Sequence, residues 1–195
     1  MDFIEYILQR FFQASNRYPV ELKGKWGYMN RKGKLVIEPK YQFADEFHNG
    51  RGRVQSNYLF GFVNKTGKLV IDCVFEEADM FSEGLCAVRR DGLYGYIDQK
   101  GKLVIPYKYH QAGLFLNGLA RVSINHKHGF INAKGEAVIP RAFGGVSEYP
   151  WGGLFRTIGR KEFYYTRKGK QIWPNERYFS KEEMCIVEED GELPY

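Results

Sequence analysis

Short apolar stretches recur along the chain at a constant interval of 34 residues. The run Leu35–Val36–Ile37 places apolar side chains on both sides of an extended backbone. We therefore expect a short strand that is buried on both faces. Equivalent runs begin at Leu69, at Leu103 and, with alanine in the first position, at Ala137. A fixed interval of this length indicates one small structural unit that is built several times in tandem.

Glycine repeats at the same interval, in three separate series. No insertion or deletion interrupts them, so the chain contains four complete units and the start of a fifth. The units begin at residues 25, 59, 93, 127 and 161. The first series is Gly27, Gly61, Gly95 and Gly129, the second is Gly33, Gly67, Gly101, Gly135 and Gly169, and the third is Gly50, Gly84, Gly118 and Gly152.

Each unit is interpreted as three short antiparallel strands. In the first unit, Asn30 is followed three residues later by Gly33. This spacing predicts a type I turn whose glycine adopts the left-handed conformation. The third glycine of the unit, Gly50, leads into the third strand. The connection around Ala44, and the equivalent one around Ala78, is expected to form one helical turn.

An aromatic residue stands before the first glycine in three of the units. These residues are Trp26, Phe60 and Tyr94. A glycine in a strand exposes bare backbone, over which an aromatic ring from a neighbouring strand can lie. We expect this stacking to fix the pairing of the strands.

The two ends of the chain differ from the repeats. Apolar residues between Asp2 and Ala14 recur at three-and-four spacing and predict an amphipathic helix that caps the array. Three segments result: a capping helix and connector at 1–23, the repeat array at 24–176, and an acidic tail or cap at 177–195. The fold class is an all-β repeat array. Because the ends are distinct, an open superhelix is favoured over a closed propeller.

The repeated residues resemble a known family. The Trp-Gly-Tyr pattern, then Gly-Lys-Leu-Val-Ile, then Phe-x-x-Gly-Leu-Ala-x-Val is similar to the WG repeat, also called the KWG repeat, of bacterial proteins. The departures are His128 at an aromatic position, Phe163 at a glycine position, and Glu38 and Asp72 where proline usually ends the strand. The resemblance implies a β-rich protein that mediates interactions and has no catalytic residues.

The charge of the chain points toward an acidic partner. The formal net charge is +6, with a concentration of basic residues in the last repeat. We expect a non-catalytic protein-binding module in a bacterial cytoplasm, acting as a monomer or in a heteromeric complex. One specific form would be an inhibitor or immunity protein that occludes its partner's active site. The expected partner-binding residues are Arg31, Lys32, Arg53, Arg89, Arg90, Arg121, Arg160 and Lys161.

Two other binding functions remain open. Arginines in or near the third strands could form a basic stripe for nucleic acid. Rows of tyrosine and tryptophan could instead bind carbohydrate at a cell surface. Positions that differ between units are expected to carry the affinity for a partner. They are the turn pairs Arg31–Lys32, Lys65–Thr66, Gln99–Lys100 and Ala133–Lys134, and the turns between units at Gln55–Tyr58, Arg89–Gly92 and Ser123–His126.

The sequence contains no strong candidate for a catalytic or metal-binding site. His126 and His128 form a pair with no third ligand at a suitable spacing. The three cysteines Cys73, Cys86 and Cys185 form no CxxC motif, and Cys86 falls at a core position. Neither a metal, a cofactor nor a membrane segment is expected. The carboxylates Asp45, Glu46, Glu76, Glu77 and Asp79 are interpreted as a solvated acidic edge.

Overall fold

The computed structural model describes residues 17–143, 145–148, 154–158, 164–166 and 168–173. These residues form antiparallel strands without any helix, which confirms the predicted all-β repeat class. They divide into two compact units, residues 1–116 and 117–195. The predicted N-terminal helix and the acidic tail at 177–195 lie outside the described residues.

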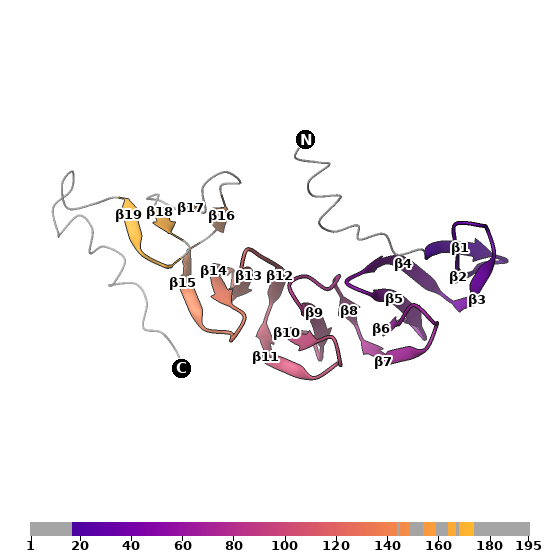
Figure 1. Ribbon diagram of the computed structural model, residues 1–195. Coiled ribbons are helices and arrows are strands. Elements are labelled where there is room, and N and C mark those ends of the chain that lie inside the picture. The colour runs from indigo at the N-terminus through magenta and orange to yellow at the C-terminus, as the bar shows by residue number, and fades with distance from the viewer. Residues whose placement is uncertain (1–16, 144, 149–153, 159–163, 167, 174–195) are drawn as a thin grey trace. The chain divides into compact units, whose positions relative to one another are not determined.

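The first unit contains three antiparallel sheets that follow one another in chain order (Figure 1). The first sheet has the order β1-β2-β3, and the other two have four strands each, β4-β5-β6-β7 and β8-β9-β10-β11. Strand β12 (Gln111–Leu116) ends this unit. The bounds are β1 Tyr18–Leu22, β2 Lys25–Met29, β3 Leu35–Tyr41, β4 Phe43–His48, β5 Arg51–Ser56, β6 Leu59–Val63, β7 Leu69–Phe75, β8 Glu77–Ala78, β9 Leu85–Arg90, β10 Leu93–Asp98 and β11 Leu103–Tyr109.

The second unit repeats the same pattern. Strands β13, β14 and β15 form an antiparallel ladder, and β16 to β19 form a four-stranded sheet in chain order. No sheet formed by the described residues of either unit closes on itself. The bounds are β13 Leu119–Ile124, β14 Lys127–Asn132, β15 Ala137–Phe143, β16 Gly145–Glu148, β17 Leu154–Ile158, β18 Tyr164–Thr166 and β19 Gln171–Trp173.

Each four-stranded sheet contains one strand more than the three predicted per unit. The extra strand is β4 in the second sheet and β8 in the third, which include Ala44 and Ala78. The helical turn predicted there is therefore wrong. Both alanines are buried, at 3% and 7% exposure, and pair with valines of the next strand. The pairing of β4 with β5 shifts register between Ala44 and Phe47, so buried and exposed residues do not alternate regularly there and the sequence shows no clear strand period.

The core of the first unit lies between successive sheets. Tyr28 of the first sheet packs edge-on against Phe47 of the second, with ring centroids 4.9 Å apart. Phe62 and Phe81 repeat this contact at 4.9 Å, as do Tyr96 and Phe115. One buried cluster thus joins the first sheet to the second, and another joins the second to the third. Stacking of the sheets, rather than any sheet alone, buries the apolar residues.

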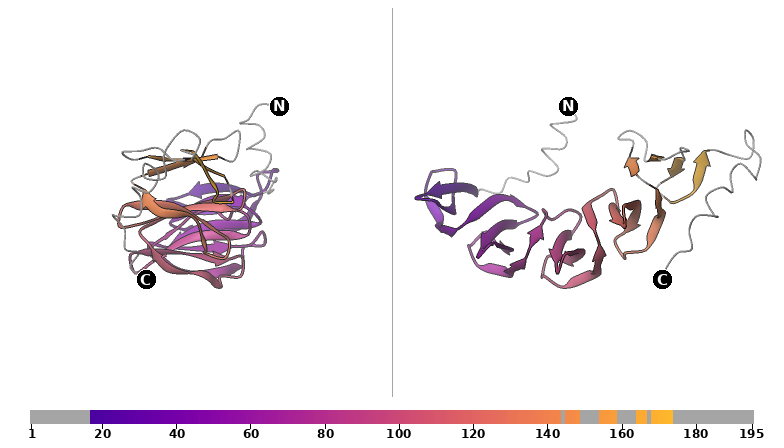
Figure 2. Two further views of the ribbon diagram at one scale, coloured as in Figure 1. Left: turned by 90° about the vertical axis from the view of Figure 1, so that its left-hand side faces the viewer. Right: turned by 180° about the vertical axis from the view of Figure 1, so that it is seen from behind.

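The strands with apolar residues on both faces lie at the outer rim. Strands β3, β7 and β11 end their sheets opposite β1, β4 and β8, as the views in Figures 1 and 2 show. In β7, Ile71 is 6% exposed, whereas Leu69 is 38% exposed. The prediction of burial on both faces is therefore wrong. In β11, which repeats this run, Ile105 is 1% exposed, whereas Leu103 is 40% and Val104, on the opposite face, is 41% exposed.

The glycine of the aromatic–glycine pair has a different neighbour from the one expected. A Cβ atom at Gly61 would lie 2.6 Å from the carbonyl oxygen of Ile71 and 2.7 Å from the amide nitrogen of Cys73. Gly27 and Gly95 meet the same backbone atoms of β3 and β11. The bulged backbone of the outer strand, and not an aromatic ring, therefore covers each of these glycines.

Candidate functional site

A turn of constant geometry joins the last two strands of each sheet. In the first turn, the side-chain oxygen of Asn30 accepts hydrogen bonds from the amides of Lys32 and Lys34, at 2.9 and 3.1 Å. Gly33 donates to the Asn30 carbonyl at 3.0 Å and has a φ of 74°. The predicted turn is confirmed here. Matching turns begin at Asn64, Asp98, Asn132 and, with a hydroxyl as the acceptor, Thr166.

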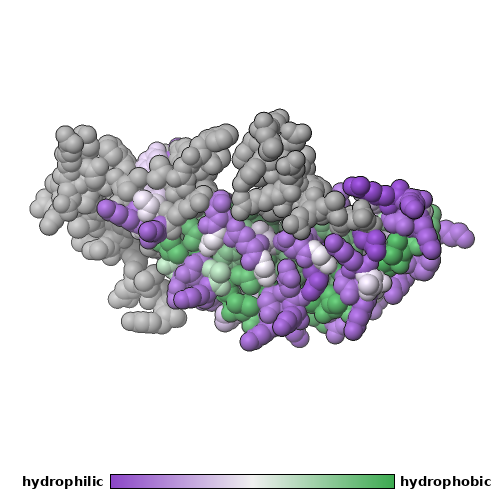
Figure 3. All heavy atoms as spheres, in the orientation of Figure 1, coloured by the Kyte–Doolittle hydropathy of each residue, from purple (hydrophilic) through white to green (hydrophobic). Residues whose placement is uncertain are grey.

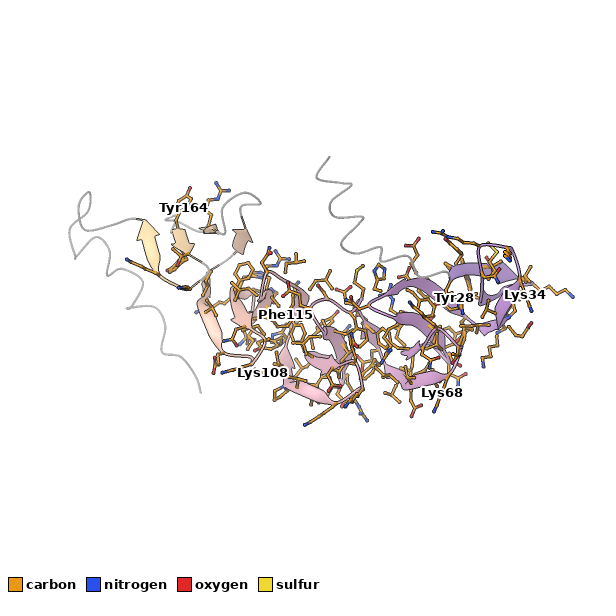
Figure 4. The ribbon with its side chains drawn as sticks, in the orientation of Figure 1. Tyr28, Lys34, Lys68, Lys108, Phe115 and Tyr164 are labelled. Atoms are coloured by element: carbon orange, nitrogen blue, oxygen red, sulfur yellow. The ribbon has the colours of Figure 1, made fainter. Side chains whose placement is uncertain are left out.

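Three of these turns present cationic side chains from the first unit. We name this surface the basic turn row. The only carboxylate within the three turns is Asp98, which accepts the amides of Lys100 and Lys102 at 2.8 and 2.9 Å. Figure 3 shows hydrophilic residues over this part of the unit, and Figure 4 labels Lys34 and Lys68. The row consists of the exposed residues Arg31, Lys32, Lys34, Lys65, Lys68, Lys100 and Lys102.

The backbone of the row is held rigid by its own hydrogen bonds. The amide of Lys102, followed by other groups of the turn, lowers the pKa of the Asp98 carboxyl below its ordinary value. Asp98 therefore stays ionised and keeps its acceptor capacity at neutral pH. A fixed turn presents its lysines without the cost of ordering the loop on binding.

Contacts between sheets hold the turns of the row in place. The guanidinium of Arg51 donates from Nε and Nη2 to the carbonyl of Gln99, at 3.3 and 2.9 Å. Arg17, one repeat earlier, donates to the carbonyl of Lys65 at 2.8 Å. Each of these arginines therefore ties its sheet to the turn of the following sheet. A main-chain acceptor allows this link to recur whatever residue stands in the turn.

The residues predicted to bind a partner have different surroundings. Arg31 and Lys32 belong to the basic turn row, and Arg31 also donates from Nε to the hydroxyl of Tyr18 at 3.0 Å. Arg90 and Arg121 are exposed on β9 and β13. Arg160 and Lys161 lie outside the described residues.

Arg53 is held by contacts within the first unit. It pairs with Asp45 at 2.6 Å, donates to the carbonyl of Ala78 in the next sheet, and lies over the rings of Phe43 and Phe60 at 5.6 Å. Its side chain is 25% exposed. These partners give Arg53 a role in joining two sheets.

Arg89 belongs to a cross-strand network on the third sheet. It pairs with Glu77 at 2.6 Å and with Glu76 at 3.5 Å, and Glu77 accepts a hydrogen bond from the hydroxyl of Tyr94. Burial, together with this bond to Glu77, raises the pKa of Tyr94 to about 12. The bond from Tyr94, followed by that from Arg89, lowers the pKa of Glu77. The two acids predicted to form a solvated edge thus neutralise Arg89.

The hairpin turns between successive sequence repeats include the most exposed aromatic side chain among the described residues. Tyr58 is 79% exposed and has a φ of 62°, where the equivalent positions Gly24 and Gly92 hold glycine. Its amide donates to the side chain of Gln42 at 3.0 Å. Variation at this turn matches an expected location of affinity for a partner, although its role in binding stays a prediction.

The histidines and cysteines considered for metal binding or catalysis do not come together in one site among the described residues. His128 is half-buried, and burial lowers its pKa, followed by the nearby charge of Arg121. The thiol of Cys86 is buried and donates to the carbonyl of Asp79 at 3.1 Å, and burial raises its pKa. The described residues include no group of three or more potential ligands that could hold a metal. They also form no helix that could traverse a bilayer.

Sequence reasoning missed part of the basic turn row. It selected the turn pairs Arg31–Lys32, Lys65–Thr66 and Gln99–Lys100, but not the glycine-following residues Lys34, Lys68 and Lys102. The signal was present, because all three lysines directly follow a glycine at the same repeat position. Their exposure at a strand end became visible only in the folded turn.

Comparisons with known proteins agree with this repeat architecture. The family profile described as "WG containing repeat" matches residues 26–59, 60–94 and 94–127, which is just over half of the chain. No curated protein matches the chain. Among solved structures, the chain is similar to Hsv2 of Kluyveromyces lactis, with a TM-score of 0.50 and 13% identity over 82% of this chain.

The match to Hsv2 concerns the fold alone. This chain spans 60% of the length of that protein. A protein of unknown function from Bacteroides caccae matches with a TM-score of 0.34 and 14% identity, over 82% of this chain and 77% of its own. The three consecutive profile matches coincide with the repeated sheets and turns described above. The chain belongs to the family of WG containing repeat proteins.

Proposed function

We propose that this chain is a non-catalytic binding module whose basic turn row recognises an acidic surface on another protein. The observation that carries the proposal is the repetition of one rigid turn with exposed cations in three successive sheets. Rows of like charge steer an oppositely charged partner and select its orientation. An acidic patch that follows the row would meet several lysines at once.

Nucleic acid is the second candidate, and the position of the aromatic residues makes it less favoured. Single-stranded nucleic acid is bound by cations together with aromatic rings on which the bases stack. The large aromatics Tyr28, Phe62 and Tyr96 are fully buried between the sheets. The three turns of the row contain no aromatic residue. A protein carboxylate surface needs only the cations and therefore fits the row better.

The biological role would be that of an adaptor or an inhibitor. A module that covers an acidic active-site rim would block its partner without any chemistry of its own, as an immunity protein does. A cytoplasmic location remains part of this proposal, and Cys73 and Cys86 are both free thiols, as a reducing compartment requires.

Affinity capture with two matched double variants tests the proposal. Lys34→Glu with Lys68→Glu reverses two charges in the row, whereas Lys40→Glu with Lys108→Glu makes the same charge change on exposed lysines of β3 and β11. Tagged wild-type protein should retain acidic proteins from cells of the source organism at physiological salt. The row variant should retain at least about tenfold less, since each reversal removes roughly 1 kcal/mol of attraction.

Nuclease treatment separates the two candidate functions. If capture disappears after nuclease, the bound species is nucleic acid and the alternative is correct. Equal losses in the two double variants would mean that net charge, and not the turn row, determines binding. Absence of any retained protein would contradict the proposal.

A further inference from the structure

One position of the basic turn row holds the same residue in all three sheets of the first unit. A lysine directly follows the turn glycine each time, and all three lysines are exposed. The ion pairs among the described residues engage Arg53 and Arg89 but none of these lysines. Figure 4 labels the first two of them. We name this set, Lys34, Lys68 and Lys102, the lysine ladder.

The packing of each turn on the preceding sheet sets the spacing of the ladder. A Cβ atom at Gly67 would lie 3.0 Å from Cγ1 of Ile37 in β3, and one at Gly101 would lie 3.3 Å from Cγ1 of Ile71 in β7. Each turn therefore rests directly on the outer strand of the sheet before it. Sheets that pack face to face stand about 10 Å apart. We expect the lysines to repeat at this interval, so the ladder is about 20 Å long.

A leucine follows each lysine of the ladder and adds an apolar side chain at the same interval. Leu69 and Leu103 are 38% and 40% exposed, and Leu35 is half-buried. The carboxylates of the outer strands, Glu38 and Asp72, stand four residues beyond the lysines, about 13 Å along the strand. Each sheet thus offers a partner one lysine next to one leucine, with the nearest acid of β3 or β7 further along that strand.

An interval of about 10 Å fits an acidic α-helix better than an acidic strand. A helix rises 1.5 Å per residue, so every seventh residue returns to nearly the same face after about 10.5 Å. On a strand, residues of one face recur at about 6.7 Å and then at about 13 Å, so a carboxylate that meets one lysine misses the next. An amphipathic helix also carries apolar residues three or four positions away from its acidic column, where they can reach the leucines.

We propose that the lysine ladder binds an amphipathic helix of the partner that carries carboxylates at positions i, i+7 and i+14. Each carboxylate meets the lysine of one sheet, and the apolar residues between them cover Leu69 and Leu103. This inference rests on the proposed function and specifies the shape of the acidic surface that the basic turn row recognises.

Binding of the purified full chain to three synthetic peptides of about 18 residues tests the spacing and the conformation. Two are stapled helices of one composition, with glutamates at i, i+7 and i+14 or at i, i+3 and i+7, both sets on one face. The third is a polyproline helix with a glutamate at every third residue, which repeats its charge about every 9 Å. Fluorescence anisotropy at about 50 mM salt should show the first peptide binding at least about fivefold tighter than either of the others.

A charge exchange at the middle of the ladder tests the register. Lys68→Glu should weaken binding of the first peptide at least about threefold, and a lysine in place of its central glutamate should restore the affinity. Lys40→Glu makes the same charge change on an exposed lysine of β3 outside the ladder and should alter the affinity by less than about twofold. A loss with Lys40→Glu as large as that with Lys68→Glu would mean that net charge alone attracts the peptide, and would overturn the inference.

The remaining outcomes separate this inference from the proposed function. Equal affinity for the two helical peptides overturns the seven-residue spacing, and equal affinity for the polyproline peptide overturns the helix. Absence of binding to all three peptides also overturns the inference. In each of these cases the proposed function still stands if Lys34→Glu with Lys68→Glu abolishes the capture of acidic proteins, and it falls as well if capture is unchanged.

Discussion

At the scale of the residue, the glycines show how local chemistry serves the packing. Sequence spacing identified Gly33 and its equivalents as left-handed turn residues, and their φ values of 74–88° confirm this. The spacing could not explain why position 61 requires glycine. Its neighbours Ile71 and Cys73 come from the bulge of another strand, and the position of a bulge depends on how the two strands pair.

Substitution of Gly61 tests whether the close approach of the β7 backbone is what requires glycine there. Gly61→Ala should lower the free energy of unfolding by about 1–3 kcal/mol or more, because the added carbon meets backbone atoms that cannot move as a side chain can. Urea denaturation measures the change. Gly92→Asn is the control: its Cβ would meet nothing within 4 Å, and Tyr58 holds the same position in the preceding unit. It should cost less than about 1 kcal/mol, and equal losses would refute the close-approach explanation.

At the scale of the element, each sheet is offset from the repeat seen in the sequence. The strands of the second sheet run from Phe43 to Phe75 and therefore combine the end of one sequence unit with most of the next. The glycine spacing fixed the length of the repeat but not where a sheet begins. Strand β4 escaped prediction because it follows β3 after a single residue, Gln42.

Substitution of Arg51 tests how much its contact with the next sheet contributes to stability. Arg51→Ala removes two hydrogen bonds to the carbonyl of Gln99 and should lower the free energy of unfolding by about 1–2 kcal/mol. Arg90→Ala removes the same charge from an exposed position of β9 and should change it by less than about 0.5 kcal/mol. Urea unfolding of both variants gives the comparison. Similar losses would show that the hydrogen bonds from Arg51 to the turn at Gln99 make no specific contribution to stability.

At the scale of the whole molecule, we expect the repeats to behave as interchangeable modules. The buried clusters join each sheet of the first unit to the next, so stability should be a sum of terms for sheets and for their interfaces. The link from Arg51 and that from Arg17 end on main-chain carbonyls, which every repeat possesses. Removal of one complete repeat should therefore leave a foldable array.

Deletion of residues 59–92 tests this modularity. It joins Tyr58 to Leu93, so that β5 pairs with β10 through residues equivalent to those of β6. We expect a folded protein by circular dichroism, with a smaller urea m-value because less surface is buried. Deletion of residues 59–75 is the control, since it removes β6 and β7 out of step with the repeat and should prevent folding. An unfolded protein after the 59–92 deletion would contradict the modular account.

The sequence by itself determined the repeat length, the strand class, the turn geometry and the family, because each depends on local backbone conformation at fixed spacing. It also predicted part of an exposed basic surface, through its charge and the residues Arg31 and Lys32. Only the tertiary structure decided that Arg53 and Arg89 are engaged within the molecule, that lysines after the glycines extend the basic turn row, and that β7 ends its sheet. These outcomes depend on the register in which the strands pair and on which strand ends each sheet, and both are decided by the folded backbone and not by the spacing of residues along the chain.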